Sequence, residues 1–458
     1  MKPELSSHLR IHVVGAGGAG MSAIAEVLAA MGHEVSGSDL SPSATLDRLA
    51  DRGVATYVGH APEQVGGVDL VAVSTAVPLD DLEVVSARSS GVPVHSRAEV
   101  LAAVCGLRRT VAVSGTHGKT TTSSLLASAL AAAGMRPSWI VGAPFGGHDT
   151  GARWDEGDWL VVEADESDGT FTVLPAELAV VTSVEADHLD HHGDLGGLVT
   201  AFDRFLAGAS GGGLVCADDP IAAELGRRRA AASYGCAPES DYRLTDVRPS
   251  RSSVRFALAR GPETLGNVAV GLPGLHNARN GAAAIAAAMM AGASFEGAAA
   301  GVAAVVGVAR RFELRGERAG VSFVDDYAHH PGEVIAALAA AADGGWDRVV
   351  CVFQPHRYSR TAALWQEFGP AFDAADALFV TDVYAAGEAP VTGVSGRLVA
   401  DAARAARPGR PVAYHPDRAR LVAELRAGLR PGDLCLTLGA GDLTTLADEL
   451  LSPTGAGS

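Results

Sequence analysis

Short apolar runs of strand length alternate with longer Ala- and Leu-rich runs of helical periodicity along the whole chain. The first such pair is "IHVVGAG" followed by "AGMSAIAEVLAAMG", and the alternation continues through "EVSGSD", "VDLVAVST" and "VPVHSRAEVLAAV". Strands that alternate with helices are typical of α/β domains with largely parallel sheets. The pattern therefore predicts an α/β fold that begins with a mononucleotide-binding arrangement.

The alternation starts afresh at two places, which predicts three domains. A new strand, "TVAVSGT", follows Leu107, and the strands "DWLVVEAD" and "ELAVVTSVEADH" come after it. Residues 242–274 predict antiparallel strands that decorate this second domain. A third set, "VSFVDDYA", "RVVCVFQPH", "ALFVTDVY" and "DLCLTLGAG", begins after residue 312. Because 458 residues exceed one ordinary core, we expect domains at residues 1–107, 108–311 and 312–458.

Composition and charge narrow the function classes. The net charge of −17 argues against a nucleic-acid partner, which needs a basic face. The five cysteines are scattered without a CxxC pair, as expected for buried thiols in a reducing compartment. The N-terminus lacks an apolar signal region, and no apolar run has the length of a membrane span. We therefore expect a soluble cytoplasmic protein without a membrane partner.

Lysine is almost absent, and Lys119 is the only one beyond residue 2. In "TVAVSGTHGKTTTSSLL" a strand leads through Gly115 and Gly118 to Lys119 and Thr120, where a helix begins. This arrangement surrounds phosphates with backbone N–H groups, while the lysine neutralises β/γ oxygens and the hydroxyl holds Mg²⁺. The motif is a variant, because GxxxxGK[ST] has glycine where this chain has Val113. An ordinary Gly-rich turn is the alternative, but a compact ammonium at this position favours a phosphate ligand.

A second glycine-rich loop, "GAGGAGMSA", follows the first strand. Gly15, Gly17 and Gly20 match GxGxxG, and Asp39 lies 24 residues after Gly15, close to the spacing that favours NAD. An NAD-dependent dehydrogenase is therefore an alternative of another class. It needs a catalytic pair in the following domain, where this chain has a phosphate loop. We favour a nucleotide diphosphate other than NAD.

Acidic residues follow the strand "DWLVVEAD". Glu163, Asp165, Glu166 and Asp168 lie just beyond its carboxyl end, where α/β sheets hold their ligands. A solvated acidic loop is the alternative. Beside a phosphate loop in the same domain, a carboxylate for Mg²⁺ is the better interpretation.

Two further segments carry polar clusters in the second domain. "EADHLDHHGD" gathers histidines, but its spacing fits neither HxHxDH nor HExxH, so we expect no zinc site. In "LHNARNGAAAI" Asn277 and Asn280 lie at i, i+3 at a helix start. Their amides suit either the edge of a nucleobase or a helix cap.

Basic and imidazole side chains concentrate in about fifty residues of the third domain, although the protein is acidic. Arginine is the side chain suited to forked contacts with phosphate and carboxylate. Surface charge is the alternative, but positions at strand ends favour closure over an anionic transition state. The residues are Arg310, Arg311, Asp326, His329, His330, His356, Arg357 and Arg360.

Seven motifs together resemble the Mur ligase family, in the same order and over nearly the whole chain. They are "GTHGKTTT", "EADESD", "DHLD", "HNxxN", "RRFE", "DDYAHHP" and "QPHRYSRT". The family comprises ATP-dependent, amide-bond-forming ligases of peptidoglycan synthesis. The resemblance implies an N-terminal Rossmann-like UDP-binding domain and a central P-loop-type ATPase with a parallel sheet plus a small antiparallel sheet. It also implies a C-terminal Rossmann-like domain that closes on both.

The resemblance further implies ATP and Mg²⁺ as cofactors and assigns the site residues. It places ATP on Gly115, Thr116, His117, Gly118, Lys119, Thr120 and Thr121, adenine on Asn277 and Asn280, and the ATP ribose on Asp326. It places Mg²⁺ on Thr120, Glu163 and His188. Arg311, His356 and Arg360 would contact phosphates or the acyl phosphate. His329 or His330 would help to position the amino acid. The UDP-sugar would be lined by Gly17, Gly18, Ala19, Gly20, Met21, Ser38, Asp39, Ser74 and Thr75.

Within the family, "QPHRYSRT" and "DVYAAGEAP" favour the branch that joins L-alanine to UDP-N-acetylmuramate. We expect the protein to be a monomer or homodimer. The branch that joins a tripeptide to the same sugar in cell-wall recycling is the alternative, and a non-catalytic nucleotide-binding regulator is another. Three features depart from the family pattern: Ser183 in "TSVEADH", Gly169 in "ADESDGTF", and the altered loop at residues 141–158.

Overall fold

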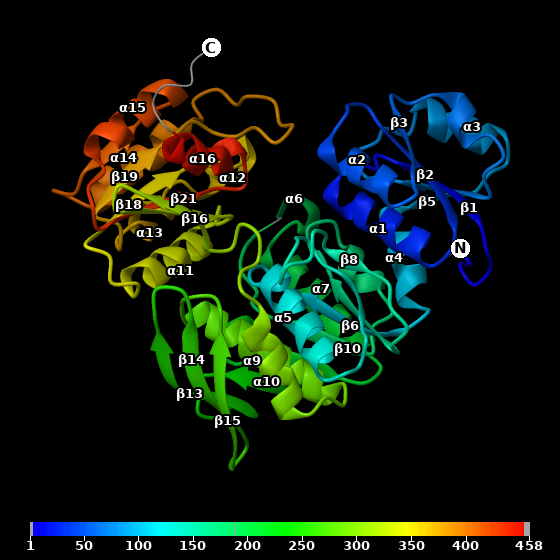
Figure 1. Ribbon diagram of the computed structural model, residues 1–458, viewed down its shortest axis with the longest axis horizontal. Coiled ribbons are helices and arrows are strands. Elements are labelled where there is room, and N and C mark those ends of the chain that lie inside the picture. Colours follow the sequence, from blue (N-terminus) through cyan, green and yellow to red (C-terminus); the bar gives the residue numbers. More distant parts are fainter. Residues whose placement is uncertain (1–2, 188, 453–458) are drawn as a thin grey trace. The chain divides into compact units, whose positions relative to one another are not determined.

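The computed structural model describes residues 3–187 and 189–452. Within these residues the strands form three sheets, and helices pack on each of them (Figure 1). The α/β class predicted from the alternation of strands and helices is confirmed.

The first sheet is parallel, with strand order β3-β2-β1-β4-β5. This order places the turn after β1 at a switch point, because the chain leaves β1 toward β2 on one side and β4 occupies the other side. Its strands are β1 (Arg10–Val14), β2 (Glu34–Asp39), β3 (Ala55–Val58), β4 (Leu70–Val73) and β5 (Val94–Ser96). Its helices are α1 (Ala19–Ala30), α2 (Ala44–Asp51), α3 (Leu82–Ser89) and α4 (Arg97–Cys105), with the 3₁₀ turn η1 (Pro62–Val65).

The central sheet has the strand order β15-β14-β13-β12-β11-β10-β6-β9-β7-β8. The strands predicted to decorate this domain join the same sheet, because β13 pairs in parallel with β12. The strands are β6 (Arg109–Ser114), β7 (Ser138–Ile140), β8 (Ala152–Arg153), β9 (Trp159–Glu163), β10 (Leu178–Val181), β11 (Gly213–Cys216), β12 (Ala232–Gly235), β13 (Tyr242–Pro249), β14 (Val254–Arg260) and β15 (Glu263–Val270).

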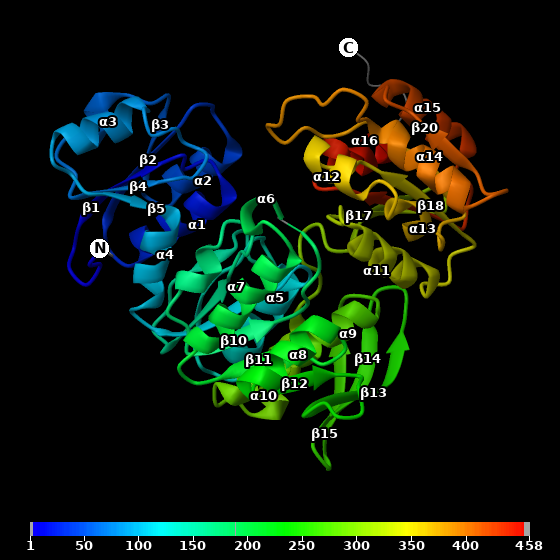
Figure 2. The same cartoon turned by 180° about the vertical axis from the view of Figure 1, so that it is seen from behind.

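Helices cover both faces of the parallel part of this sheet. Helix α5 lies on the face turned to the viewer in Figure 1, with α10 packed against it, whereas α7 and α8 lie on the face seen in Figure 2. The helices are α5 (Lys119–Ala132), α6 (Leu189–His192), α7 (Leu195–Gly208), α8 (Pro220–Arg229), α9 (Leu275–Met290) and α10 (Phe295–Ala304), with η2 (Thr170–Val173).

The third sheet has the order β16-β17-β21-β18-β19-β20, with β16 antiparallel at the edge and the rest parallel. Separate apolar clusters pack on its two faces. The strands are β16 (Glu313–Arg318), β17 (Val321–Asp326), β18 (Arg348–Phe353), β19 (Ala377–Val380), β20 (Val412–Tyr414) and β21 (Asp433–Leu438). The helices are α11 (Pro331–Ala342), α12 (Tyr358–Leu364), α13 (Phe368–Ala371), α14 (Gly396–Ala406), α15 (Arg418–Gly428) and α16 (Leu446–Leu451), with η3 (Asp442–Thr445).

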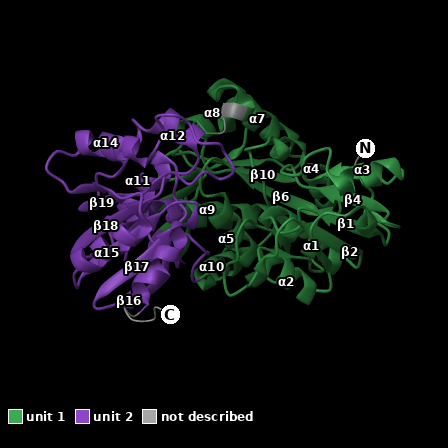
Figure 3. Cartoon of the chain, turned by 90° about the horizontal axis from the view of Figure 1, so that it is seen from above, with its two compact units in different colours: residues 1–245, 257–268, 279–305 green, residues 246–256, 269–278, 306–458 purple. Residues whose placement is uncertain are grey.

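The chain divides into two compact units (Figure 3). The first contains the N-terminal sheet and most of the central domain, in residues 1–245, 257–268 and 279–305. The second contains residues 246–256, 269–278 and 306–458. A search of the described helices finds none with the length and apolarity needed to cross a membrane.

Close packing of α10 against α5 gives a stability prediction. A Cβ added at Gly301 of α10 would lie 2.7 Å from the Cα of Ala129, so Gly301→Ala should lower the free energy of unfolding by about 1–3 kcal/mol. The matched control is Gly208→Ala in α7, whose added Cβ meets no atom within 4 Å. It should leave stability unchanged or raise it by up to about 1 kcal/mol. Thermal unfolding measures both, and an unchanged melting temperature for Gly301→Ala would contradict this packing.

Candidate active site

The loop between β6 and α5 is a backbone cradle. Gly115 and Gly118 have φ of 134° and 83°, a region that favours glycine. An added Cβ at Gly115 would lie 2.9 Å from the backbone nitrogen of Ser183, and one at Gly118 would lie 2.5 Å from Oδ1 of Asn280. Helix α5 begins directly after this loop at Lys119, so its first N–H groups have no partner within the helix. The loop is therefore shaped to receive an anionic group.

Lys119 is held inside this loop. Its ammonium donates to the carbonyl oxygen of Gly115 at 2.7 Å, to that of Thr116 at 3.3 Å, and to Oε1 of Glu166 at 2.9 Å. Burial lowers the pKa of Lys119, but the charges of Glu166, Asp165 and Glu163 outweigh it and hold the pKa above its ordinary value. The only interior lysine is therefore a fixed cation.

Thr120 and Glu163 fit the predicted magnesium site. The Thr120 hydroxyl donates to Oε1 of Glu163 at 2.9 Å, and the backbone N–H of Gly142 donates to Oε2 at 2.6 Å. Neighbouring ligands of an octahedral Mg²⁺ at about 2.1 Å are about 3 Å apart, so the two side-chain oxygens have suitable spacing. The third predicted ligand, His188, lies outside the described residues.

The four acidic residues at and after the end of β9 lie in three different environments. Asp165 and Asp168 accept hydrogen bonds from backbone N–H groups two residues ahead, at Ser167 and Thr170. Glu166 is 1% exposed. Burial raises the pKa of Glu166 to about 6, against the lowering effect of Lys119. A single run of four acidic residues therefore supplies two turn-forming carboxylates, a candidate metal ligand at Glu163 and a buried partner for Lys119.

Two of the departures from the family pattern have structural reasons. Gly169 has a φ of 73°, and a Cβ there would lie 2.8 Å from Nε2 of His191. Ser183 places its hydroxyl where it accepts a hydrogen bond from the backbone N–H of His117 at 3.0 Å. Ser183 therefore supports the phosphate loop, and Gly169 leaves room for the ring of His191.

The two asparagines predicted for adenine lie on α9. Oδ1 of Asn280 accepts from the hydroxyl of Thr122 at 3.2 Å, next to the phosphate loop. Nδ2 of Asn277 donates to the carbonyl oxygen of Pro273 at 2.7 Å. Both side chains are buried, and each has a contact within the protein, that of Asn277 at the start of α9 and that of Asn280 across to α5.

The predicted UDP-sugar residues converge at the carboxyl edge of the first sheet. The backbone N–H of Gly17 donates to Oδ2 of Asp39 at 2.9 Å, and a Cβ on Gly17 would lie 2.7 Å from that oxygen. A Cβ on Gly15 would lie 2.9 Å from Cβ of Ser74, which follows β4. The other predicted residues of this set lie on the same loop, in the first turn of α1 and at strand ends; they are Gly18, Ala19, Gly20, Met21, Ser38 and Thr75.

A buried polar network below this edge was not predicted. His12 and Glu83 are 0% exposed, and both contact Ser38. The Ser38 hydroxyl donates to Oε2 of Glu83 at 2.6 Å, and Nε2 of His12 lies 3.2 Å from the same hydroxyl. Burial tends to raise the pKa of Glu83, but its contacts with His12 and Ser38 hold the pKa below its ordinary value. His12 lies inside the apolar strand "RIHVV". A polar residue at a buried strand position is the feature of the sequence that could have indicated this network.

A small cavity connects the first sheet to the central one. It has a volume of about 130 Å³ and is lined by Gly20 and Arg97 on one side and by Gly142, Glu163 and Asp165 on the other. A Cβ on Gly20 would lie 2.7 Å from Nε of Arg97. The close approach of this guanidinium therefore requires glycine at the third position of GxGxxG. Arg97 was not singled out by sequence, because its partner glycine is 77 residues away.

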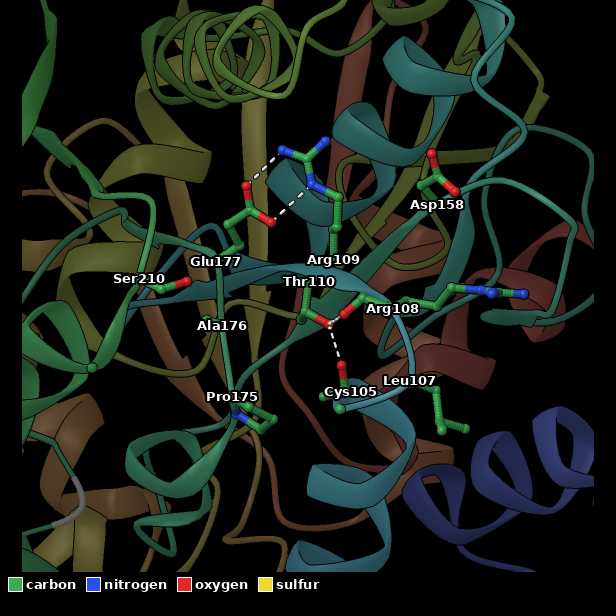
Figure 4. A pocket seen from close by; sticks show the side chains of 12 residues that line it. Cys105, Leu107, Arg108, Arg109, Thr110, Asp158, Pro175, Ala176, Glu177 and Ser210 are labelled. Carbon is green, nitrogen blue, oxygen red and sulfur yellow. Dashed lines mark hydrogen bonds and ion pairs between the residues drawn. The ribbon is translucent and has the colours of Figure 1, made fainter. Parts of the chain in front are cut away.

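Another cavity lies at the opposite edge of the central sheet (Figure 4). It has a volume of about 530 Å³ and surrounds the start of β6, a full strand away from the phosphate loop. Arg109 makes a forked ion pair with Glu177 there, at 2.8 and 2.6 Å. None of the predicted site residues lines it.

In the third domain, the predicted residues gather at the carboxyl ends of β17 and β18. Asp326 is 8% exposed, and its two oxygens accept from the backbone N–H groups of Phe312 and Ala328 at 2.7 and 2.8 Å. Burial raises the pKa of Asp326 to about 6, against the charge of Arg311. A carboxylate oxygen accepts two hydrogen bonds, so this anchoring leaves capacity for the predicted ribose contact.

Imidazole rings form a stack beside these strands. His329 packs edge-on to His356 at a centroid distance of 5.4 Å, and Tyr384 stacks on His356 at 5.7 Å. Nδ1 of His356 lies 3.2 Å from a guanidinium nitrogen of Arg360. Burial lowers the pKa of His356 to about 3, with His329 and Arg360 acting in the same direction. His356 is therefore neutral, and the positive charge of this cluster resides on arginine. Tyr384 was not predicted individually.

His330, Arg310 and Arg357 have structural contacts in the same domain. His330 is the N-cap of α11, where its backbone N–H donates to Glu333. Arg310 pairs with Asp325 at 3.3 Å and also donates to the Gly439 carbonyl. Arg357 adopts a φ of 69° directly before α12.

The fold and these clusters define a multidomain α/β protein with a phosphate-binding loop. Three family models match the chain: "Mur ligase family, catalytic domain" over residues 10–109, "Mur ligase middle domain" over 113–288, and "Mur ligase, glutamate ligase domain" over 310–441. The chain belongs to the Mur ligase family.

Relatives and solved structures match over nearly the full length. UDP-N-acetylmuramate–L-alanine ligase of Kineococcus radiotolerans is 47% identical, covering 97% of this chain and 96% of the relative. The same enzyme of Anaeromyxobacter dehalogenans is 45% identical, covering 98% of both. The crystal structure of UDP-N-acetylmuramate–alanine ligase MurC from Thermotoga maritima is 26% identical and superposes with a TM-score of 0.81, covering 97% of this chain and 98% of that one.

The burial of Glu166 gives a prediction for stability against pH. Its pKa in the folded protein lies above its ordinary value of 4.5, so the folded state loses stability as the pH rises from 4.5 to about 6. Glu166→Gln removes this penalty. Its melting temperature relative to the wild type should therefore rise over that interval and stay constant above it. The corresponding gain in the free energy of unfolding is about 2 kcal/mol at most.

Glu177→Gln is the matched control for that measurement. The hydrogen bond from Arg109 lowers the pKa of Glu177, so its contribution is present above pH 4.5 and is lost as the pH falls. Thermal unfolding of both variants between pH 3 and 8 should give slopes of opposite sign, below pH 4.5 for Glu177→Gln and between pH 4.5 and about 6 for Glu166→Gln. Slopes of the same sign would contradict the burial of Glu166.

Proposed function

We propose that this protein is an ATP-dependent ligase that joins L-alanine to the lactyl carboxylate of UDP-N-acetylmuramate, in cytoplasmic synthesis of the peptidoglycan precursor. The observation that carries the proposal is full-length similarity of 45–47% to ligases of this specificity, combined with an intact phosphate loop. The geometry at that loop supports a reaction that transfers the γ-phosphoryl group.

The cavity between the two sheets supplies a route for the sugar nucleotide. UDP is assigned to the glycine loop at residues 15–21, where the N-terminus of α1 receives a diphosphate. From Gly20 the cavity leads past Arg97 to Glu163, beside the phosphate loop. A substrate bound in this way has its lactyl carboxylate at the γ-phosphate of an ATP held by the loop.

The chemistry needs positioned charge more than a nucleophilic side chain. The lactyl carboxylate attacks the γ-phosphorus, the bond to the β-phosphate oxygen breaks, and ADP leaves, giving an acyl phosphate. The neutral amine of L-alanine then attacks the acyl carbon, the bond from that carbon to the phosphate oxygen breaks, and inorganic phosphate leaves with one proton of the amine as the amide forms. The Lys119 ammonium and the N–H groups at the start of α5 hold the transferred oxygens.

Magnesium is assigned to Thr120 and Glu163, whose oxygens have the spacing of neighbouring ligands. When bound there, Mg²⁺ neutralises phosphate oxygens during transfer. We assign adenine to Asn277 and Asn280 and the ATP ribose to Asp326. The acyl phosphate is assigned to Arg311, His356 and Arg360, and alanine to His329 or His330.

The first prediction of this proposal concerns substrate. Phosphate release should require ATP, UDP-N-acetylmuramate and an amino acid together, with L-alanine giving the highest kcat/KM across a panel of amino acids. The L-Ala-D-Glu-diamino-acid tripeptide is the critical comparison in the same assay. Turnover with the tripeptide and none with alanine would assign the protein to the recycling branch, and substrate-dependent NAD reduction would overturn the class.

The second prediction concerns Lys119→Arg. A wide planar guanidinium does not fit a loop in which the ammonium makes three contacts of 2.7–3.3 Å. Turnover should fall by more than about two decades, roughly 3 kcal/mol of transition-state stabilisation. Calorimetric binding of UDP-N-acetylmuramate should be nearly unchanged, because its assigned loop lies on a different sheet. Substantial remaining turnover would show that Lys119 does not contact the γ-phosphate.

A further inference from the structure

The three hydrogens of the Lys119 ammonium are already directed to protein oxygens. Two acceptors are carbonyls of the loop itself, Gly115 at 2.7 Å and Thr116 at 3.3 Å. The third is the side chain of Glu166, at 2.9 Å. A phosphate oxygen that reaches this ammonium must therefore replace one of the three. The longest bond, to Thr116, is the cheapest to give up.

The burial of the Glu166 carboxylate beside the phosphate loop is unfavourable for the stability of the folded protein. Its side chain is 2% exposed, and among the described residues its Oε2 has no hydrogen-bond partner. A buried carboxylate oxygen without a partner is unfavourable by itself. A negative charge next to a phosphate-binding cation also opposes phosphate binding. The contact with Lys119 is the compensating interaction present in the structure.

The backbone around Glu166 is fixed independently of that contact. Its carbonyl oxygen lies 2.8 Å from Nε2 of His192, the last residue of α6. The carboxylate of Asp165 anchors the N–H of Ser167 at 3.0 Å. The loop therefore holds Glu166 in place, and Glu166 in turn limits where the flexible four-carbon stem of Lys119 can place its ammonium.

We propose that Glu166 is the positioning residue for the phosphate lysine: its Oε1 keeps the Lys119 ammonium over the loop throughout phosphoryl transfer, while the Thr116 carbonyl is the contact exchanged for phosphate. Glu166 acts through Lys119 and touches no substrate. This inference rests on the proposed function, because it takes Lys119 as the ligand of the γ-phosphate. It assigns a role within the acidic loop that differs from the metal role assigned to Glu163.

Two substitutions of Glu166 distinguish a role in positioning Lys119 from an effect of its negative charge. Gln keeps an oxygen acceptor at the position of Oε1, whereas Ala removes it. With ATP as the varied substrate, Glu166→Ala should lower kcat about 10- to 100-fold, because the ammonium loses its fixed place. Glu166→Gln should keep kcat within about fivefold of the wild type, and its KM for ATP should fall because a negative charge near the phosphates is removed. Glu177→Gln, at the far edge of the same sheet, should match the wild type in both constants.

A double-mutant cycle tests whether Glu166 acts through Lys119. Binding of a β,γ-methylene ATP analogue and of UDP-N-acetylmuramate is measured calorimetrically for Lys119→Ala, Glu166→Ala and the double variant. In the Lys119→Ala background, Glu166→Ala should not weaken binding of the analogue further. The UDP-sugar affinity reports whether each variant is folded, and Glu166→Gln supplies an activity measurement if the Ala variant is not.

Each outcome has one meaning. Wild-type kcat for Glu166→Ala, a Gln variant as impaired as the Ala variant, or additive losses in the cycle would each overturn the positioning role. Equal impairment of the Gln and Ala variants would show that the ionisable group of Glu166 itself is needed. If Lys119→Ala leaves both analogue binding and turnover unchanged, the proposed phosphate site fails, and that result is distinct from a failure confined to Glu166.

Discussion

Parallel pairing of β9, β6 and β10 is the constraint on which the candidate site depends. The registers place Val113 beside Glu163 and Ser114 beside Val181, so the three strands end at one edge of the sheet. The segments that leave these ends are the acidic loop, the phosphate loop and the segment that begins at Thr182. This arrangement brings the Thr120 hydroxyl to 2.9 Å from Glu163 and the Ser183 hydroxyl to 3.0 Å from the backbone nitrogen of His117. The chemistry is therefore a consequence of strand register.

Strand register alone does not explain why glycine is needed at these positions. At each one, a particular side chain limits the space beside the backbone. At Gly118 the limiting neighbour is Asn280 from α9, at Gly17 it is Asp39, and at Gly20 it is Arg97. In each case a polar side chain occupies the space that a Cβ needs. A Cβ at any of these positions would force the neighbouring polar side chain away from the backbone. Glycine at these positions therefore serves the site as well as the turn.

The sequence allowed prediction of features whose cause lies within a short segment. The α/β class, the phosphate loop and the set of strand ends follow from local periodicity and spacing, and the structure has them where the motifs lie. Glu83, Arg97 and Tyr384 could not be identified in this way, because each acquires its role from a partner 28 to 77 residues away. The partners are Ser38, Gly20 and His356, in that order. The different environments of Glu163 and Glu166 also needed coordinates, since both belong to one acidic run.

Electrostatics set the final constraint on this site. The chain carries a net charge of −17, so its long-range field repels the nucleotide and carboxylate substrates assigned to it. Attraction must therefore come from groups at short range, where screening by water and salt is weak. Lys119 is one such group, and the carboxylates around it hold its pKa above the ordinary value despite its burial, which keeps it charged. The same carboxylates weaken its pull on phosphate. In the proposed site, a lysine placed in this way would contribute less to the strength of binding than to where the phosphate is held, and the rest of the attraction would fall to backbone N–H groups and the proposed magnesium ion.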